Sequence, residues 1–326
     1  MPPRFSVEVA MRYDLTFIIG VVKSRERFLL GDKIDRLAEG SSEDAFRLLK
    51  ESGFGGETPA EGPHQAERLI RAEEADLNSF VREYAPTDKT AAFLLAEYDF
   101  HNAEALVKCR YAGANEEKLL SAEGYFTIGF LKENIFGEGE GLPAELKSAA
   151  ETSAALFSGG KANGLEIDCI FKRELYAYMK RRAEGKKLKE ILSASADAAN
   201  VSSALRSREA SLAEKMFVTG GKLPLSQIIA LCDASYQDIK DGDYPPEIKE
   251  AAAAAEREEP LSSFERSRDD FPLLLLYKTR YDMAGAEPFL TYVYRRRAEI
   301  RNARLITVSL AAGLSPSAIK NKIRLY

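Results

Sequence analysis

The chain has 326 residues, of which 45% are hydrophobic, and this is the composition of a globular protein rather than a disordered one. Its formal net charge of -5 gives no general attraction to phosphate backbones, so we expect no nucleic-acid partner. The three cysteines lack paired or metal-ligand spacing and no apolar run approaches the roughly 20 residues of a membrane span, so we expect a protein of the reducing cytoplasm.

The first third of the chain predicts three helices. Apolar residues between Leu15 and Val22 predict a helix that becomes charged over residues 23–27. Ser41 or Ser42 predicts the capped start of a second helix, which the glycines after residue 52 end. Residues 63–85 predict an amphipathic helix, whose apolar positions are Leu69, Ile70, Leu77, Phe80 and Val81.

The remainder of the chain also reads as helix. Residues 86–88 provide a break and a cap before a long helix over residues 89–111, and further helical stretches cover residues 165–208 and 263–310 with short loops inside them. The run from Leu273 to Leu276 favours a buried helix turn, with Pro272 in its first turn. Alternation of the kind that strands require is almost absent, so we predict an all-α fold.

A polar pattern recurs along these helices. Asp, Asn and Arg stand at offsets of three and eleven residues, and the occurrences are Asp99, Asn102 and Arg110; Asp197, Asn200 and Arg208; Asp14 and Arg25 in part; and Glu299 and Asn302 in part. Eleven residues are about three helical turns, so each set lies near one face. We expect the Asn to bridge helices and the Arg to pair with carboxylates, which fixes helix register. The alternative is that these positions line a shared central surface.

Two further elements repeat in the same order. Residues 49–54 are similar to 131–136 and, more loosely, to 239–244, while residues 143–150 are similar to 245–252. The period of about a hundred residues is far longer than that of a solenoid repeat. We therefore predict three similar helical domains, with approximate bounds 1–112, 113–213 and 214–326.

No motif in the chain assembles an active site. Neither His64 nor His101 has metal-ligand spacing. The phrases Ser158–Lys161 and Thr219–Lys222 contain Gly-Gly-Lys but lack the first glycine and the hydroxyl residue of a phosphate-binding loop. No Gly-x-Ser-x-Gly elbow is present. We expect an interaction protein that is not an enzyme and that binds no metal, nucleotide or other cofactor.

The C-terminal stretch over residues 288–306, with its continuation 312–323, resembles the C subunits of A/V-type ATPases, whose eukaryotic homologue is the d subunit. Residues 24–30 and 164–168 fit the same family. The resemblance implies a funnel of three similar helical domains around a pseudo-threefold axis. It further implies a rotor part that links the central-stalk shaft to the membrane proteolipid ring, supports proton or sodium transport, and is peripheral to the membrane through that ring.

Basic side chains are the candidates for contact with these partners. They are Arg25, Arg110 and Arg208 from the polar pattern, and Arg295, Arg296, Arg297, Arg301 and Arg304 near the C-terminus. Because nothing follows the fourth copy of the long helix, we expect that copy to pack beside the N-terminal helices. Two alternatives are an unrelated helical-repeat scaffold that binds a partner helix, and an all-helical enzyme with paired carboxylates, for which we find no acidic metal motif.

Overall fold

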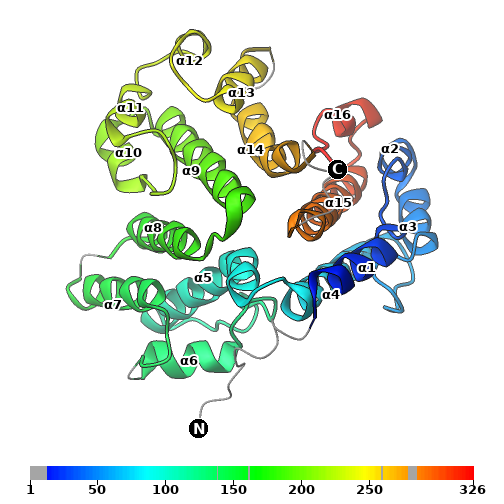
Figure 1. Cartoon of the computed structure of the whole chain (residues 1–326), viewed down its shortest axis with the longest axis horizontal. Coiled ribbons are helices and arrows are strands. Elements are labelled where there is room, and N and C mark those ends of the chain that lie inside the picture. Colours follow the sequence, from blue (N-terminus) through cyan, green and yellow to red (C-terminus); the bar gives the residue numbers. More distant parts are fainter. Residues whose placement is uncertain (1–12, 138, 161, 258–259, 278–284) are drawn as a thin grey trace. The chain divides into compact units, whose positions relative to one another are not determined.

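The computed structural model describes residues 13–137, 139–160, 162–257, 260–277 and 285–326, and these form helices with no strand (Figure 1). The all-α prediction is therefore confirmed. The chain divides into two compact units: unit 1 combines the described part of Met1–Asp88 with Pro272–Tyr326, and unit 2 is Lys89–Phe271. The three-domain division and the funnel shape stay predictions.

Unit 1 joins the two ends of the chain. It contains α1 (Leu15–Glu26), α2 (Lys33–Glu39), α3 (Ser42–Glu51), the 3-10 turn Pro63–Gln65, α4 (Ala66–Tyr84), α15 (Glu287–Ala311) and α16 (Pro316–Lys320). Helix α15 packs against α1, α2, α3 and α4, which confirms that the last copy of the long helix lies beside the N-terminal helices. The fully buried Phe289, Val293 and Ile306 supply its apolar contacts.

The termini of the helices in unit 1 follow the capping rules. At the start of α3 the Ser41 hydroxyl accepts from Asp44 N at 3.1 Å, and the Asp44 carboxylate accepts from Ser41 N at 3.3 Å. At the end of α15, Gly313 has a φ of 75° and Leu314 N donates to Ser309 O at 3.0 Å. Gly313 thus ends the long helix, and α16 follows it.

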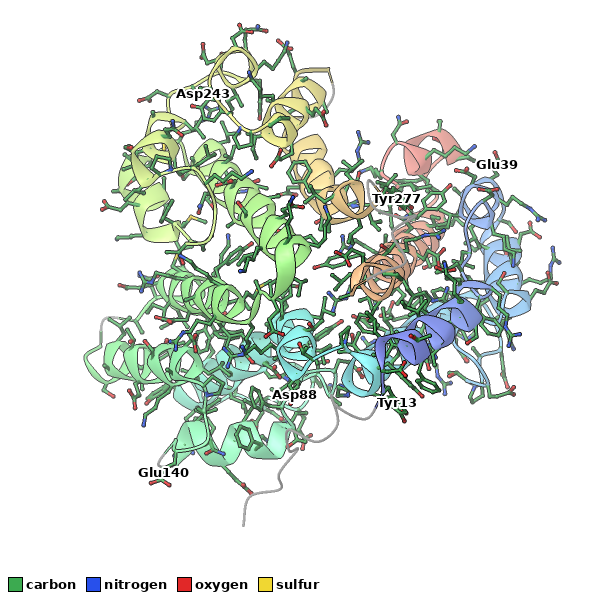
Figure 2. The ribbon with its side chains drawn as sticks, viewed as in Figure 1. Tyr13, Glu39, Asp88, Glu140, Asp243 and Tyr277 are labelled. Atoms are coloured by element: carbon green, nitrogen blue, oxygen red, sulfur yellow. The ribbon has the colours of Figure 1, made fainter. Side chains whose placement is uncertain are left out.

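The short helix α16 is held against α2. Glu39, the last residue of α2, lies at the surface (Figure 2), where its carboxylate is 2.6 Å from Lys320 Nζ. This pair lowers the pKa of Glu39, chiefly through the hydrogen bond from Lys320. Tyr277 Oη donates to the main-chain oxygen of Tyr326 at 2.6 Å. The last residues of the chain are therefore fixed on unit 1.

Unit 2 holds most of the remaining helices. These are α5 (Asp88–Ala112, whose first residue belongs to unit 1), α6 (Ile128–Phe136), α7 (Ala144–Ser158), α8 (Gly164–Arg182), α9 (Gly185–Ser207), α10 (Ala210–Met216), α11 (Leu225–Ala230), α12 (Tyr236–Asp241), α13 (Pro246–Arg257) and α14 (Pro260–Tyr277, whose part from Pro272 onward belongs to unit 1). A core of buried side chains from α5, α6, α7 and α8 includes Phe100, Leu131, Leu146, Phe171 and Tyr178. Burial of these side chains stabilises the packing of the four helices.

The expectation for Pro272 is wrong. We expected it in the first turn of a helix, but it lies inside α14, which begins at Pro260. An internal proline removes one helical hydrogen bond. Phe271, Leu273 and Leu276 of the same helix are buried, and their burial offsets that loss.

No helix in the described part of the chain is long and apolar enough to cross a membrane. The thiols of Cys109, Cys169 and Cys232 are free and buried. Burial raises the pKa of the Cys169 and Cys232 thiols above the usual range.

Candidate functional site

The repeated asparagines each hold a segment of main chain outside the helices. Asn102 Nδ2 donates to Ser121 O at 2.7 Å, and its Oδ1 accepts from Ser121 N at 2.8 Å. Asn200 does the same for Val218, at 2.9 and 2.8 Å. The expectation that these side chains bridge helices is wrong, because helical main chain has its own hydrogen-bond partners and only loops present both groups.

The repeated aspartates hold the following few residues of the same loops. Asp197 accepts from Leu223 N at 2.9 Å and from Lys222 N at 3.0 Å. A Cβ on Gly221 would overlap this carboxylate, so the Gly-Gly-Lys phrase is a loop folded around Asp197. Burial raises the pKa of Asp197, although the two main-chain donors act in the opposite direction.

The same arrangement recurs at the other two copies. Asp99 Oδ1 accepts from Phe126 N at 3.0 Å, and a Cβ on Gly124 would overlap it. Glu299 Oε1 accepts from Gly31 N at 3.0 Å. The acidic member of the last copy thus binds a turn near the start of the chain, so the module that it belongs to is built from both ends.

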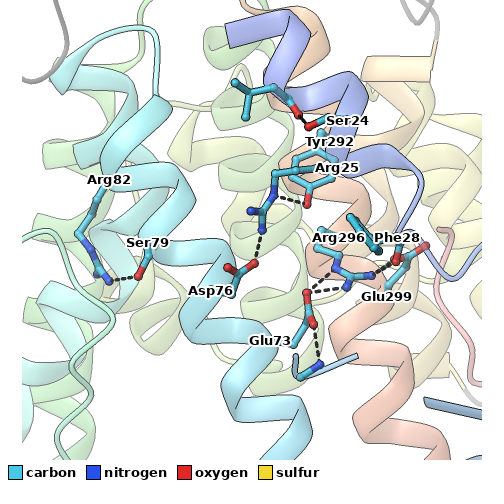
Figure 3. A network of polar contacts seen from close by, with 12 residues as sticks. Ser24, Arg25, Phe28, Glu73, Asp76, Ser79, Arg82, Tyr292, Arg296 and Glu299 are labelled. Carbon is cyan, nitrogen blue, oxygen red and sulfur yellow. Dashed lines mark hydrogen bonds and ion pairs between the residues drawn. The ribbon is translucent and has the colours of Figure 1, made fainter. Parts of the chain in front are cut away.

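The first copy of the pattern differs from the others. Asp14 is the N-cap of α1 and accepts from Phe17 N at 2.7 Å. Arg25 forms an ion pair with Asp76 of α4 and donates from Nε to Tyr292 Oη of α15 at 3.0 Å, as Figure 3 shows. Pairing with a carboxylate, as expected for the arginines, is therefore found at Arg25, where it joins three helices of unit 1.

The two corresponding arginines of unit 2 are exposed. The guanidinium of Arg110, in the last turn of α5, lies over the ring of Phe136 at 5.0 Å. Arg208 has a left-handed φ of 53° after α9 and donates to Cys232 O at 3.3 Å and Ala234 O at 2.6 Å. Arg25, Arg110 and Arg208 therefore have three different local environments.

The centre of unit 1 is a buried charge network around Arg296. This residue is 3% exposed, and its guanidinium lies 2.8 Å from Glu73 Oε1 and 2.9 Å from Glu299 Oε2 (Figure 3). It also donates to Phe28 O at 2.9 Å and stacks over the ring of Phe54 at 4.9 Å. One arginine thus joins α15, α4 and the turn after α1.

A second arginine extends the link between α15 and α4. Arg304 Nε lies 3.2 Å from Glu67 Oε2, and its terminal nitrogen lies 2.8 Å from Glu74 Oε2. The same face of α4 therefore supplies two carboxylates that are about two helical turns apart. Charge-assisted hydrogen bonds of this kind fix orientation as well as distance.

The other members of the C-terminal cluster are more accessible. Arg295 and Arg297 are half-buried and Arg301 is exposed. The guanidinium of Arg297 lies 5.8 Å from the ring of Tyr294. The five arginines thus divide into Arg296 and Arg304, which are bound to carboxylates of α4, and three that reach the surface.

The carboxylates of α4 that pair with the arginines of α15 were not identified from the sequence. The amphipathic pattern of α4 predicts that its charged face is exposed to solvent. Glu73 stands three residues after Ile70 and four before Leu77, which places it on the apolar face. A carboxylate at such a position is a signal for a buried cation opposite it. The spacing could therefore have predicted the site of Glu73, though not that Arg296 fills it.

The residue types that most often act in catalysis or metal binding form no such site in the described part of the chain. His101 Nε2 lies 2.9 Å from Leu119 O. Across the described ranges, no group of three or more His, Cys, Asp or Glu side chains is placed to hold a metal ion. The polar side chains of the site instead bind helices and loops to one another.

Comparison with known proteins agrees with the resemblance seen in the sequence. The model of the ATP synthase (C/AC39) subunit family matches residues 18–322. The C subunit of the V-type sodium ATPase of Enterococcus hirae is 23% identical over 92% of both chains, and the C subunit of the A-type ATP synthase of Haloferax volcanii is 24% identical over 94% of this chain and 96% of its own. A third relative, the C subunit of the A-type ATP synthase of Desulfurococcus sp., is 28% identical over 44% of this chain and 41% of its own. These matches remove the alternative of an unrelated scaffold. Because the family model spans nearly all of it, this all-helical chain belongs to the ATP synthase (C/AC39) subunit family.

Proposed function

We propose that this protein is a non-catalytic rotor part that couples the central-stalk shaft of an A/V-type ATPase to the membrane proteolipid ring. In this role it supports proton or sodium transport linked to ATP synthesis or hydrolysis, on the cytoplasmic side of the membrane. The observation that carries the proposal is the family match over residues 18–322. The funnel of three domains around a pseudo-threefold axis is part of the same proposal.

The polar networks support a mechanical role. A part that transmits torque must resist deformation between its two attachment points. In unit 1 the buried Arg296 links two carboxylates and a main-chain oxygen, and in unit 2 Asn200 and Asp197 fix one loop at three residues. Close-packed interiors that contain hydrogen-bond networks of this kind have low compressibility.

The accessible arginines are the proposed contacts with shaft and ring. Arg110 and Arg208 are exposed in unit 2, and Arg295, Arg297 and Arg301 reach the surface of unit 1. Rim charges of this type contribute to orientation and association rate more than to affinity. We assign Arg25, Arg296 and Arg304 to the internal framework instead, because each pairs with a carboxylate of α4.

The test uses the ATPase reconstituted in vesicles with and without this chain. Without it, we expect ATP hydrolysis to continue while ion uptake falls to background, and we expect the purified chain to restore uptake. The variant Arg110→Glu with Arg208→Glu should restore less, whereas Lys118→Glu with Lys215→Glu, also at exposed positions, should restore uptake fully. Ion uptake at the full rate in the absence of the chain would refute the coupling role.

A further inference from the structure

The connection between α8 and α9 concentrates positive charge in a chain whose net charge is -5. Residues 180–190, which we name the α8–α9 corner, contain two glutamates and six cationic residues: Lys180, Arg181, Arg182, Lys186, Lys187 and Lys189. Only Ala183 and Glu184 separate the two helices. The end of α8 and the start of α9 are therefore next to each other, as Figure 1 shows.

Most of these cations face solvent. Lys180 and Lys189 are exposed, and neither has an ion pair within the described residues. The Lys186 side chain is 85% exposed, with Glu190 3.9 Å away on the same helix. Arg181 is 64% exposed and lies 2.6 Å from the buried Glu145. The corner thus presents at least three lysines whose charge no neighbouring carboxylate closely neutralises.

Lysines at this place are unfavourable for the isolated helix. Lys186, Lys187 and Lys189 stand at the start of α9, whose first turn contains no acidic residue and has no side-chain cap. The positive end of the helix dipole repels cations there. Within the described residues, Glu190 pairs with Lys187 at 2.9 Å and lies 3.9 Å from Lys186, while Lys189 has no ion pair. One carboxylate beside three lysines leaves most of this charge uncompensated, which indicates a partner outside the protein. That partner must carry negative charge.

The make-up of the corner favours a lipid surface over a protein. Four of the six cations are lysines, a residue that is depleted in protein interfaces, where arginine and aromatic residues dominate. The apolar residues of the corner, Ala183 and Leu188, are buried, so no hydrophobic anchor projects from it. Clusters of four to eight exposed cations that act through charge alone are typical of contacts with anionic headgroups. We propose that the α8–α9 corner binds the anionic phospholipid headgroups of a membrane surface.

The proposal is tested by sedimentation of the purified chain with vesicles of phosphatidylcholine, alone or with about one third phosphatidylglycerol. We expect binding to the anionic vesicles only, and weakening as salt is raised. Each lysine near such a surface strengthens binding about five-fold, so the variant with Lys180, Lys186 and Lys189 all changed to Gln should bind about 100-fold more weakly. The control, Lys118→Gln with Lys215→Gln, removes exposed charge elsewhere and should bind as the unchanged chain does.

Three results would overturn the proposal. They are equal binding to both kinds of vesicle, equal loss in the control variant, and binding of poly-glutamate without binding of anionic vesicles, which would assign the corner to an acidic protein. Urea unfolding checks that the triple variant folds. We expect little change in stability, because Lys186 and Lys189 oppose the dipole of α9 whereas Lys180, in the last turn of α8, favours the dipole of that helix. The vesicles hold no other part of the ATPase, so the result is independent of the proposed coupling function.

Discussion

Asn302 holds the main chain of Arg324 through two hydrogen bonds of 2.9 Å, one to the carbonyl oxygen and one from the amide. Asn102 and Asn200 form the same pair of bonds with residues 19 and 18 positions downstream. Each asparagine side chain thus hydrogen-bonds to both the N–H and the C=O of one downstream residue, as the main chain of a neighbouring strand would. The recurring asparagine therefore identifies the point on each long helix where the downstream chain is bound.

Removing the asparagine side chain should destabilise the protein according to the burial of the bonds. Asn200→Ala leaves the buried N–H and C=O of Val218 without a partner, and we expect a loss of about 3 kcal/mol of unfolding free energy. Asn302→Ala should cost about half as much, because its bonds are partly buried and water can replace them. Urea unfolding measures both. The exposed Asn115→Ala is the control, and equal losses in all three variants would contradict the interpretation.

Arg296→Met should be severely destabilising. It leaves the carboxylates of Glu73 and Glu299 buried without a counter-charge, and we expect a loss of about 3–5 kcal/mol. The exposed pair Arg47 and Asp44 gives the comparison, since Arg47→Met should cost at most about 1 kcal/mol. Adding Glu73→Gln to Arg296→Met should recover part of the loss. If the double variant is no more stable than the single one, the charge network is not the cause.

Replacing glycine by alanine should change stability in opposite directions at a tightly packed loop position and at an exposed helix position. Gly221→Ala places a Cβ against the Asp197 carboxylate, and we expect a loss of about 2 kcal/mol. Gly20→Ala, inside α1 with nothing within 4 Å of the new Cβ, should instead stabilise by up to about 1 kcal/mol. Thermal unfolding shows both directions. Stabilisation by Gly221→Ala would show that the loop does not pack on Asp197 as described.

Asp197 should give the protein a specific pH dependence. Burial raises its pKa in the folded state above the ordinary value of 3.8, so the folded chain holds this proton at a pH where the unfolded chain has released it. The contribution of Asp197 to stability is therefore largest below pH 3.8 and falls as pH rises through the raised pKa. Asp197→Asn removes the titration. The difference in unfolding free energy between the two proteins should fall across that window, and an increase with pH would contradict the burial argument.

The local structure could be predicted from the sequence because it depends on neighbours. The cap at Ser41, the amphipathic face of α4 and the glycine stop at Gly313 each follow from a few adjacent residues. The recurrence of Asp and Asn also identified the residues that fix each loop. Their partners could not be predicted, because they lie in loops whose path depends on tertiary packing.

The candidate site was predicted less well, for a related reason. Arg296 and Arg301 are indistinguishable in a run of basic residues, yet one is buried and the other exposed. The difference arises from Glu73, which is 223 positions away from Arg296 in the sequence. Charge patterns along one helix indicate which side chains can pair, and only the fold decides which of them do.

Unit 1 takes its helices from both ends of the chain, with Glu299 bound to Gly31 and Arg296 bound to Phe28. Unit 2 is one continuous segment. During translation, the middle of the protein can therefore acquire its structure while it is still attached to the ribosome. The opening helices must wait until α15 has been made and Arg296, which neutralises Glu73, has left the exit tunnel.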